Sequence, residues 1–237
     1  MISLRHLEID HCTGLTHMPN GLGQLTALQK LTQFIVGEYF YSLNLSAWLR
    51  ELKGLNNLQG ELRIAKLENL KVSAIELEEA NLKGKLNLEV LRLEWTKEVN
   101  DHSVIDEDEA LLEGFQPHSN LKEFHIYGYR AGKFPNWMML NLSLLLPNLL
   151  EIITWRCYRC LELLIFSQLP MLKVLKLEEI IALEYIENNS NGSSSLSSFR
   201  GNQLNRGERV EQSTVLFPSL QELRLFDLRN LKGWWRE

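Results

Sequence analysis

A short leucine pattern recurs along the chain and constrains its fold more than any other feature. The template is L-x-x-L-x-L, in which isoleucine or phenylalanine can replace leucine. In x-L-x-L-x the apolar side chains share one face of a short strand and the x residues share the other. One strand cannot bury its apolar face alone, so the pattern predicts strands stacked side by side. The close matches are Leu4–Ile9, Leu88–Leu93, Leu121–Ile126, Leu172–Leu177 and Leu220–Leu225.

The spacing of these copies identifies the kind of repeat. Looser copies begin at Leu28, Gln59 and Leu149, and successive copies are 23 to 33 residues apart, with one final interval of 48. The shorter intervals match leucine-rich repeats, whose period is roughly 20–29 residues, and the longer ones indicate insertions. We therefore predict an α/β solenoid, a leucine-rich-repeat horseshoe with a parallel concave sheet. Its convex side is expected to hold irregular helices or loops.

Domain organisation follows from the same pattern. Residues 1–187 should hold about seven irregular repeats, and residues 215–237 a final, truncated repeat. Residues 188–214 are rich in Ser, Asn and Gly and poor in apolar residues, which predicts a mobile loop insertion. Among the connectors, Ser73 and Glu76 form a capping box that should open a helix running to about Lys83. A second short helical segment is expected over Glu109–Phe115.

Composition excludes several classes of function. The net charge of −5 and the pI near 5.8 argue against a general binder of nucleic acid or anionic membranes. Three cysteines cannot form a disulfide framework, and their odd number favours a reducing compartment. Met1 is not followed by a secretory signal. The most apolar window, Leu140–Ile153, is too short and too polar to span a bilayer. We expect a cytoplasmic protein without a membrane span.

A run that resembles a phosphate loop fails on its context. The pattern G-x-x-x-x-G-K-[ST] must lie between a strand and a helix. In Gly128–Phe134 (GYRAGKF), Tyr127 stands where the first glycine belongs and Phe134 where the hydroxyl belongs. Pro135 follows, so no helix can continue from the loop. The run is therefore interpreted as a turn after a strand at Glu123–Tyr127.

Cys157 and Cys160 form a lone C-x-x-C, whereas a structural zinc site needs a second ligand pair. Cys157 and Cys12 instead occupy the cysteine place of L-x-x-L-x-L-x-x-[N/C], which predicts the same packing role for both. Cys160 is then an ordinary thiol. No motif context supports a catalytic set, so we expect no enzyme activity, cofactor or metal. The histidines expected at the surface, without a ligand set, are His6, His11, His17, His102 and His118.

The outward positions of the strands form three columns across the predicted sheet. The middle column is mostly basic and the flanking columns contain glutamates, which should offset the repulsion by diagonal pairing. Two interpretations remain open, a self-paired solvated face and a protein-binding surface. In the second, Tyr127 and Trp155 on adjacent strands are the aromatic anchor. The candidate contact residues are Arg63, Arg92, His125, Tyr127, Trp155, Lys176, Arg224 and Phe226.

Several longer strings carry a resemblance to a known family. Residues 1–37 (MISLRHLEIDHCTGLTHMPNGLGQLTALQKLTQFIVG) resemble the early repeats of plant coiled-coil, nucleotide-binding, leucine-rich-repeat disease-resistance proteins. The strings LNNLQGELRIAKLENL, LRLEW, LLEGFQPHSNLKEFHIYGYRAGKFPNWM and FSQLPMLKVLKL are similar to that class too. The resemblance covers nearly the whole chain and includes connectors as well as leucines.

The resemblance implies a role in plant defence. In that family the repeats restrain a nucleotide-binding switch and help to sense pathogen effectors, directly or through a guarded host protein. The sequence shows no coiled coil and no nucleotide-binding domain, so we expect a fragment, a truncated gene product, or a partner that docks on another repeat domain. Expected partners are an effector, a guarded host protein or the nucleotide-binding domain of a receptor, but no nucleic acid. The alternative is a substrate-recognition or scaffold protein unrelated to immunity.

Overall fold

The computed structural model describes residues 2–38, 46–70, 80–96, 105–188 and 217–236. Three sequence predictions lie outside these residues. They concern the capping box at Ser73–Glu76, His102 and the loop insertion after Asn188.

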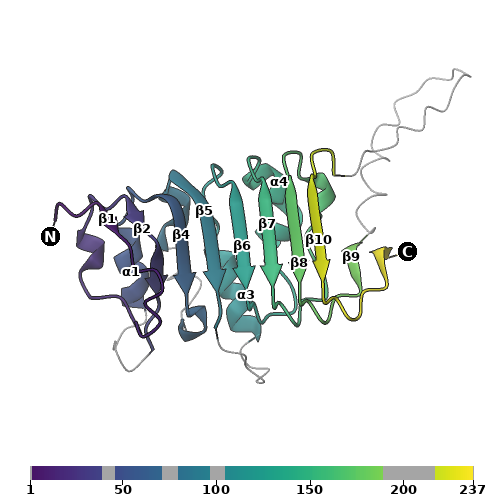
Figure 1. The fold of residues 1–237 in the computed structure, drawn as a ribbon, viewed down its shortest axis with the longest axis horizontal. Helices are drawn as coiled ribbons and strands as arrows, with labels where there is room; N and C mark the ends of the chain where they lie inside the picture. The colour runs from purple at the N-terminus through teal and green to yellow at the C-terminus, as the bar shows by residue number, and fades with distance from the viewer. Residues whose placement is uncertain (1, 39–45, 71–79, 97–104, 189–216, 237) are drawn as a thin grey trace, which may run out of the picture.

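The main sheet is parallel and follows chain order from one end to the other (Figure 1). This arrangement confirms the predicted α/β solenoid, because each strand is reached through a connector that crosses the opposite side. Every predicted copy of the leucine pattern from Gln59 onward supplies one strand. The strands of the main sheet are β3 (Gln33–Ile35), which precedes these copies, β4 (Gln59–Ala65), β5 (Asn87–Glu94), β6 (Glu123–Tyr127), β7 (Glu151–Trp155), β8 (Val174–Glu178) and β10 (Glu222–Phe226).

Two small parallel sheets flank the main one. At the N-terminal end, β1 (His6–Leu7) pairs with β2 (Lys30–Leu31). Near the C-terminal end, β9 (Tyr185–Asn188) pairs with β11 (Gly233–Arg236). The second pair joins segments that follow β8 and β10, so the repeats contact each other beyond the main sheet as well as within it.

The connectors combine α-helices with short 3-10 turns. The described α-helices are α1 (Ser46–Lys53), α3 (Ile105–Gly114) and α4 (Asn136–Leu145). The 3-10 helices are η1 (Leu22–Gln24), η3 (Leu67–Asn69), η5 (Leu82–Gly84) and η7 (Phe166–Gln168). Figure 1 shows the helices on one side of the sheet only, so the opposite side is open. We call that open side the concave face.

Three connectors differ from the sequence prediction. Helix α3 ends at Gly114, as expected, but begins earlier, at Ile105. The predicted helix reaching Lys83 cannot pass Asn81, whose left-handed backbone (φ 48°) breaks an α-helix, and a 3-10 turn follows. Helix α4 was not predicted. Pro135, in extended conformation directly before it, suits a helix start because a proline has no N–H to leave unsatisfied.

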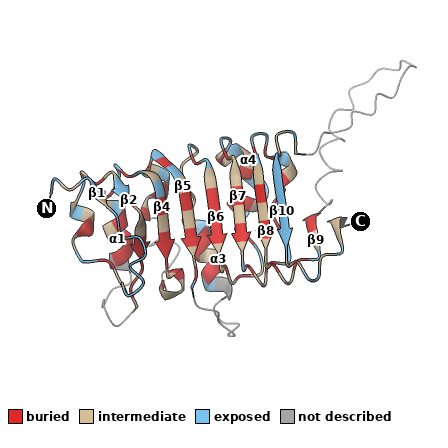
Figure 2. Cartoon of the chain, viewed as in Figure 1, coloured by how far each residue is buried: buried red, intermediate tan, exposed pale blue. Residues whose placement is uncertain are grey.

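The core is one continuous cluster between the sheet and its connectors. Figure 2 shows alternating buried and less buried positions along β7 and β8, as period-2 strands require, whereas in β6 the outward-facing His125 is buried as well. At β10 the alternation disappears, and even the inward Leu223 and Leu225 are 41% and 38% exposed. The last strand of the sheet has a neighbour on one side only, so its leucines are covered from one side only.

The same two turns recur at the ends of the strands. At the entrances, asparagine side chains donate to a carbonyl of the preceding repeat, for example Asn120 to Leu86 and Asn148 to Ser119. At the exits, the residue after the strand is left-handed, as at Gly128, Arg156 and Glu179. These turns hold neighbouring strands in one register, and that register aligns the outward side chains described next.

Candidate functional site on the concave face

The predicted columns exist from β4 to β10. The parallel register places Arg63, Arg92, His125, Ile153, Lys176 and Arg224 opposite one another in succession. The flanking columns fall into line in the same way, with Glu61, Val90, Glu123, Glu151, Val174 and Glu222 on one side. At the N-terminal end Glu8 instead pairs with Lys30, at 2.8 Å.

The charges at both ends of this face pair in a crossed pattern. Between β4 and β5, Arg63 contacts Glu94 while Arg92 Nε lies 2.8 Å from Glu61 Oε1. Each cation therefore reaches a glutamate in a different column of the neighbouring strand. This arrangement confirms the predicted diagonal pairing and removes the repulsion between the two stacked arginines.

The crossed pattern repeats between β8 and β10. Lys176 Nζ lies 3.2 Å from Glu222 Oε1, and Arg224 Nε lies 3.1 Å from Glu178 Oε1. These side chains are partly exposed, so each pair contributes little stability. These pairs neutralise the arginines and the lysine at both ends of the described face. At the β10 end, the aromatic side chain of Phe226 lies beside Arg224 and is 52% exposed.

The pattern breaks in the centre, on β6 and β7. Here the middle column holds His125 and Ile153 rather than lysine or arginine. Glu123 and Glu151 stand opposite each other, and neither forms an ion pair with a lysine or arginine within the described residues. Burial, together with the neighbouring Glu123, raises the pKa of Glu151.

His125 lies in the predicted middle column, but its side chain is buried beneath the neighbouring side chains of the face. Its side chain is 3% exposed, so it cannot offer much surface to a protein partner. Burial, reinforced by nearby Arg92 and Lys176, lowers the pKa of His125 to about 4, and the imidazole is neutral at pH 7. Nδ1 lies 3.4 Å from the Tyr127 hydroxyl. Sequence alone gave no sign of this burial.

The aromatic pair predicted as an anchor is present. The rings of Tyr127 and Trp155 meet edge to face, with centroids 6.1 Å apart, and both side chains are half-buried. Together with Arg63 and Arg92, they line a hollow of about 360 Å³ on the concave face. An aromatic pair beside a hollow and partly exposed arginines is the composition that binding hot spots favour.

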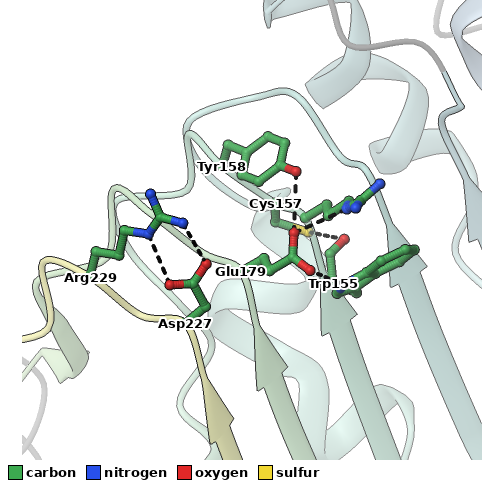
Figure 3. A network of polar contacts seen from close by, with 7 residues as sticks. Trp155, Cys157, Tyr158, Glu179, Asp227 and Arg229 are labelled. Carbon is green, nitrogen blue, oxygen red and sulfur yellow. Dashed lines mark hydrogen bonds and ion pairs between the residues drawn. The ribbon is translucent and has the colours of Figure 1, made fainter.

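Trp155 is held in place by the strand exits (Figure 3). Its Nε1 donates to Glu179 Oε1 at 2.9 Å, and the Arg156 guanidinium lies over its ring, 4.3 Å from the centroid. Arg156 and Tyr158 donate to Glu179 Oε2. The hydrogen bond from Trp155, and then those from Arg156 and Tyr158, lower the pKa of Glu179, so this carboxylate is ionised at pH 7.

The remaining sequence candidates have structural roles. In the phosphate-loop lookalike, Tyr129 and Phe134 are buried and stacked on each other, which confirms the turn interpretation. Cys157 and Cys160 are buried, whereas Cys12 is exposed. The prediction that Cys12 and Cys157 pack alike is therefore wrong. Cys12 follows β1, which among the described residues pairs with β2 alone, so its thiol is covered less than that of Cys157, which lies against the Ile126 carbonyl of the preceding strand.

Sequence reasoning missed several buried charged residues, among them Asp108, Glu187 and Lys85. Lys85 is fully buried, and its ammonium donates to the carbonyls of Leu52 and Leu55 at 2.8 and 3.1 Å. These carbonyls lie at and just beyond the last turn of α1, where the helix dipole is negative. Burial lowers the pKa of Lys85 to about 8. The short string LKGK around it carries no pattern that would have revealed this role.

Fold and face together define a leucine-rich-repeat protein with a polar, aromatic-centred concave surface. A family model described as R13L1/DRL21 LRRs matches residues 49–180, more than half of the chain. The chain therefore belongs to the R13L1/DRL21 leucine-rich repeats. No helix in the part of the chain that the structure describes has the length and apolar character needed to cross a membrane.

Similar proteins are associated with disease resistance in plants. The chain is 34% identical over 233 residues to RGA4 of Solanum bulbocastanum, a candidate disease resistance protein, covering 98% of this chain and 21% of RGA4. It is 35% identical over 212 residues to disease resistance protein RGA2 of the same species, covering 89% of this chain and 19% of RGA2. The chain thus spans about a fifth of the length of these relatives. The predicted resemblance is confirmed.

Proposed function

We propose that this chain is a protein-binding module in plant defence that recognises a pathogen effector or a host protein through its concave face. The observation that carries the proposal is the centre of that face, where Tyr127 and Trp155 border a hollow and Glu179 fixes the tryptophan. A side chain already held in its binding orientation loses little entropy on association. Because the flanking arginines are paired, the aromatic rings are the main groups with contact area to offer.

The similarity to disease resistance proteins supports the defence part of the proposal. It also brings in a third kind of partner, the nucleotide-binding domain of a receptor, because a repeat region is a small part of such relatives. With three free cysteines, one of them exposed, we propose that the protein acts in a reducing compartment, the cytoplasm. We further propose that its role is binding rather than catalysis.

The test compares two surface substitutions on opposite sides of the solenoid. Trp155→Ala removes the anchor on the concave face, and Leu144→Ala removes an equally apolar side chain, 78% exposed on α4. Tagged wild type and both variants are used for affinity capture from leaf extract, with captured proteins quantified by mass spectrometry. Circular dichroism confirms that each variant keeps its fold.

The expected result is a defined set of proteins captured by wild type and Leu144→Ala but reduced at least about tenfold with Trp155→Ala, since hot-spot truncations cost roughly 2 kcal/mol or more. The proposal fails if Trp155→Ala captures the same set at the same level. It also fails if Leu144→Ala loses that set to the same extent.

A further inference from the structure

The centre of the concave face holds a cluster whose geometry suits a metal ion. His125 Nε2 lies 3.0 Å from Glu151 Oε1 and 3.8 Å from Glu123 Oε2, and these groups can each offer a ligand atom within 4.8 Å of the others. Nε2 is buried and makes no well-aligned hydrogen bond among the residues that the structure describes, although Glu151 Oε1 lies within ion-pairing distance. A buried ring nitrogen that lies close to two carboxylates without a well-aligned hydrogen bond is the observation that needs explaining, since buried polar atoms are normally satisfied.

We propose that Glu123, His125 and Glu151 bind one divalent transition-metal ion of the zinc class on the concave face. Zinc bonds to histidine nitrogen at about 2.0–2.1 Å and to carboxylate oxygen at about 2.0–2.2 Å, so tetrahedral ligand atoms lie about 3.4 Å apart. The two separations from Nε2 lie on either side of that value. Only small side-chain movements would complete the site.

The donor set selects this class of ion. Imidazole suits zinc, copper, iron and nickel, whereas calcium needs six to eight oxygen ligands, far more than two carboxylates supply. Both carboxylates are more open to solvent than the imidazole, at 38% and 23% against 3%. An ion can therefore enter between the glutamates and meet the histidine at the floor. Three protein ligands leave a further position open to water or another donor.

The surrounding charges favour a cation at this point. Arg92 and Lys176, the nearest basic side chains in the middle column, pair with Glu61 and Glu222. Glu123 and Glu151 thus lie beside the imidazole without a lysine or arginine partner among the described residues, between two regions whose charges are paired. A divalent ion would neutralise them, as the arginines and lysine neutralise the glutamates at either end of the face.

A supporting contact lies behind the imidazole. When Nε2 binds a metal, the ring proton is on Nδ1, and Nδ1 faces the Tyr127 hydroxyl at 3.4 Å. Metal-bound histidines usually donate their second ring nitrogen to such a partner, and losing that partner costs about 10–100-fold in affinity. Tyr127→Phe should therefore weaken metal binding about tenfold while keeping all three ligands.

The test titrates Zn²⁺ into the chelator-treated 237-residue chain by isothermal calorimetry, with Co²⁺ absorption reporting the ligand geometry. Exposed Cys12 and neighbouring His11 could bind zinc separately, so all proteins carry Cys12→Ser and His11→Asn. The ligand variants are Glu123→Gln and Glu151→Gln, which keep side-chain shape. Glu89→Gln, on an exposed strand position paired with Lys122, is the matched control.

The expected result is one ion per chain, with affinity lowered on the order of 100-fold or more in each ligand variant, since even outer-shell partners contribute 10–100-fold. The Glu89→Gln control should match the parent. The proposal is overturned if the parent binds no zinc, or if the ligand variants bind it as tightly as the parent. It stands independently of the protein-binding proposal, because the titration involves no partner.

Discussion

The buried ammonium of Lys85 makes the stability of this repeat array depend on pH in a calculable way. Lys85 extends from the turn after η5 and donates to two carbonyls at the end of α1. Burial lowers its pKa from 10.5 to about 8. Because the folded chain holds this proton less tightly than the unfolded chain, the unfolded state binds more protons between these two values. The free energy of unfolding therefore rises as pH increases through this window.

The size of the effect follows from the two pKa values. A shift of one unit corresponds to about 1.36 kcal/mol, so the full difference is roughly 3 kcal/mol. Between pH 7 and pH 9.5 the linkage relation gives a gain of about 2 kcal/mol from Lys85 alone. The neutral amine still has two N–H groups for the Leu52 and Leu55 carbonyls, so the hydrogen bonds persist when the proton leaves.

The assay is urea unfolding of the wild-type chain and Lys85→Met at pH 7, 8 and 9.5, followed by circular dichroism. Other titrating groups, including the buried tyrosines, contribute equally to both proteins and cancel in the difference. The wild type should gain about 2 kcal/mol relative to Lys85→Met over this range. Exposed Lys83, two residues away, supplies the control Lys83→Met, which should keep the wild-type pH dependence.

A constant difference between wild type and Lys85→Met from pH 7 to 9.5 would refute the reasoning. The same conclusion would follow if Lys83→Met abolished the pH dependence equally. Either outcome would mean that burial at this position does not disfavour the charged amine.

Two further substitutions test the backbone and the core by the same urea assay. Gly128→Ala should cost at least about 2 kcal/mol, because a Cβ at this left-handed residue would overlap the Trp95 carbonyl oxygen. Gly60→Ala, equally left-handed but in open space, should cost only about 1 kcal/mol, and equal costs would contradict the overlap. Asp108→Ala should cost about 3–5 kcal/mol, since it leaves Arg130, bonded to it twice at 2.7 Å, as an unpaired buried charge. Adding Arg130→Met should recover part of that loss, and no recovery would show that the charge is not the cause.

The strands and columns were predictable because their cause is local. Alternating leucines assign the two faces of each strand without knowledge of its neighbours, and an equal position in each repeat then fixes the register. The crossed pairing of Arg63 with Glu94 and of Arg92 with Glu61 follows once that register is known. The open positions of the concave face could therefore be assigned from the sequence.

Burial was less predictable because it depends on residues a full repeat away. Cys12 and Cys157 occupy the same place in the pattern, yet only Cys157 is covered by an earlier strand. His125 and Lys85 are polar residues in positions that the pattern assigns to the surface or leaves unassigned. His125 is buried between neighbouring strands, and Lys85 is buried against the end of α1. The residues next to them in the sequence do not indicate this burial.

The connectors were harder still, since no period governs them. In helix α4 the apolar residues are distributed around the whole helix axis. Asn141, within the helix, departs from helical geometry. Such a segment has no clear amphipathic stripe from which a helix could be predicted. Its exposed Leu140 and Leu144 show that the convex side is less strictly patterned than the sheet.

The division of the concave face into paired ends and an unpaired centre limits where a partner can gain affinity. A charged partner residue placed over β4–β5 or β8–β10 would have to compete with an existing ion pair, and exchanging one exposed pair for another gains little. Over β6 and β7 no such competition exists, because Glu123 and Glu151 lack basic partners there within the described residues. The aromatic rings of Tyr127 and Trp155 adjoin the same place. We therefore expect the specificity of this surface for a partner to come from β6 and β7, although the columns of outward side chains extend across six strands.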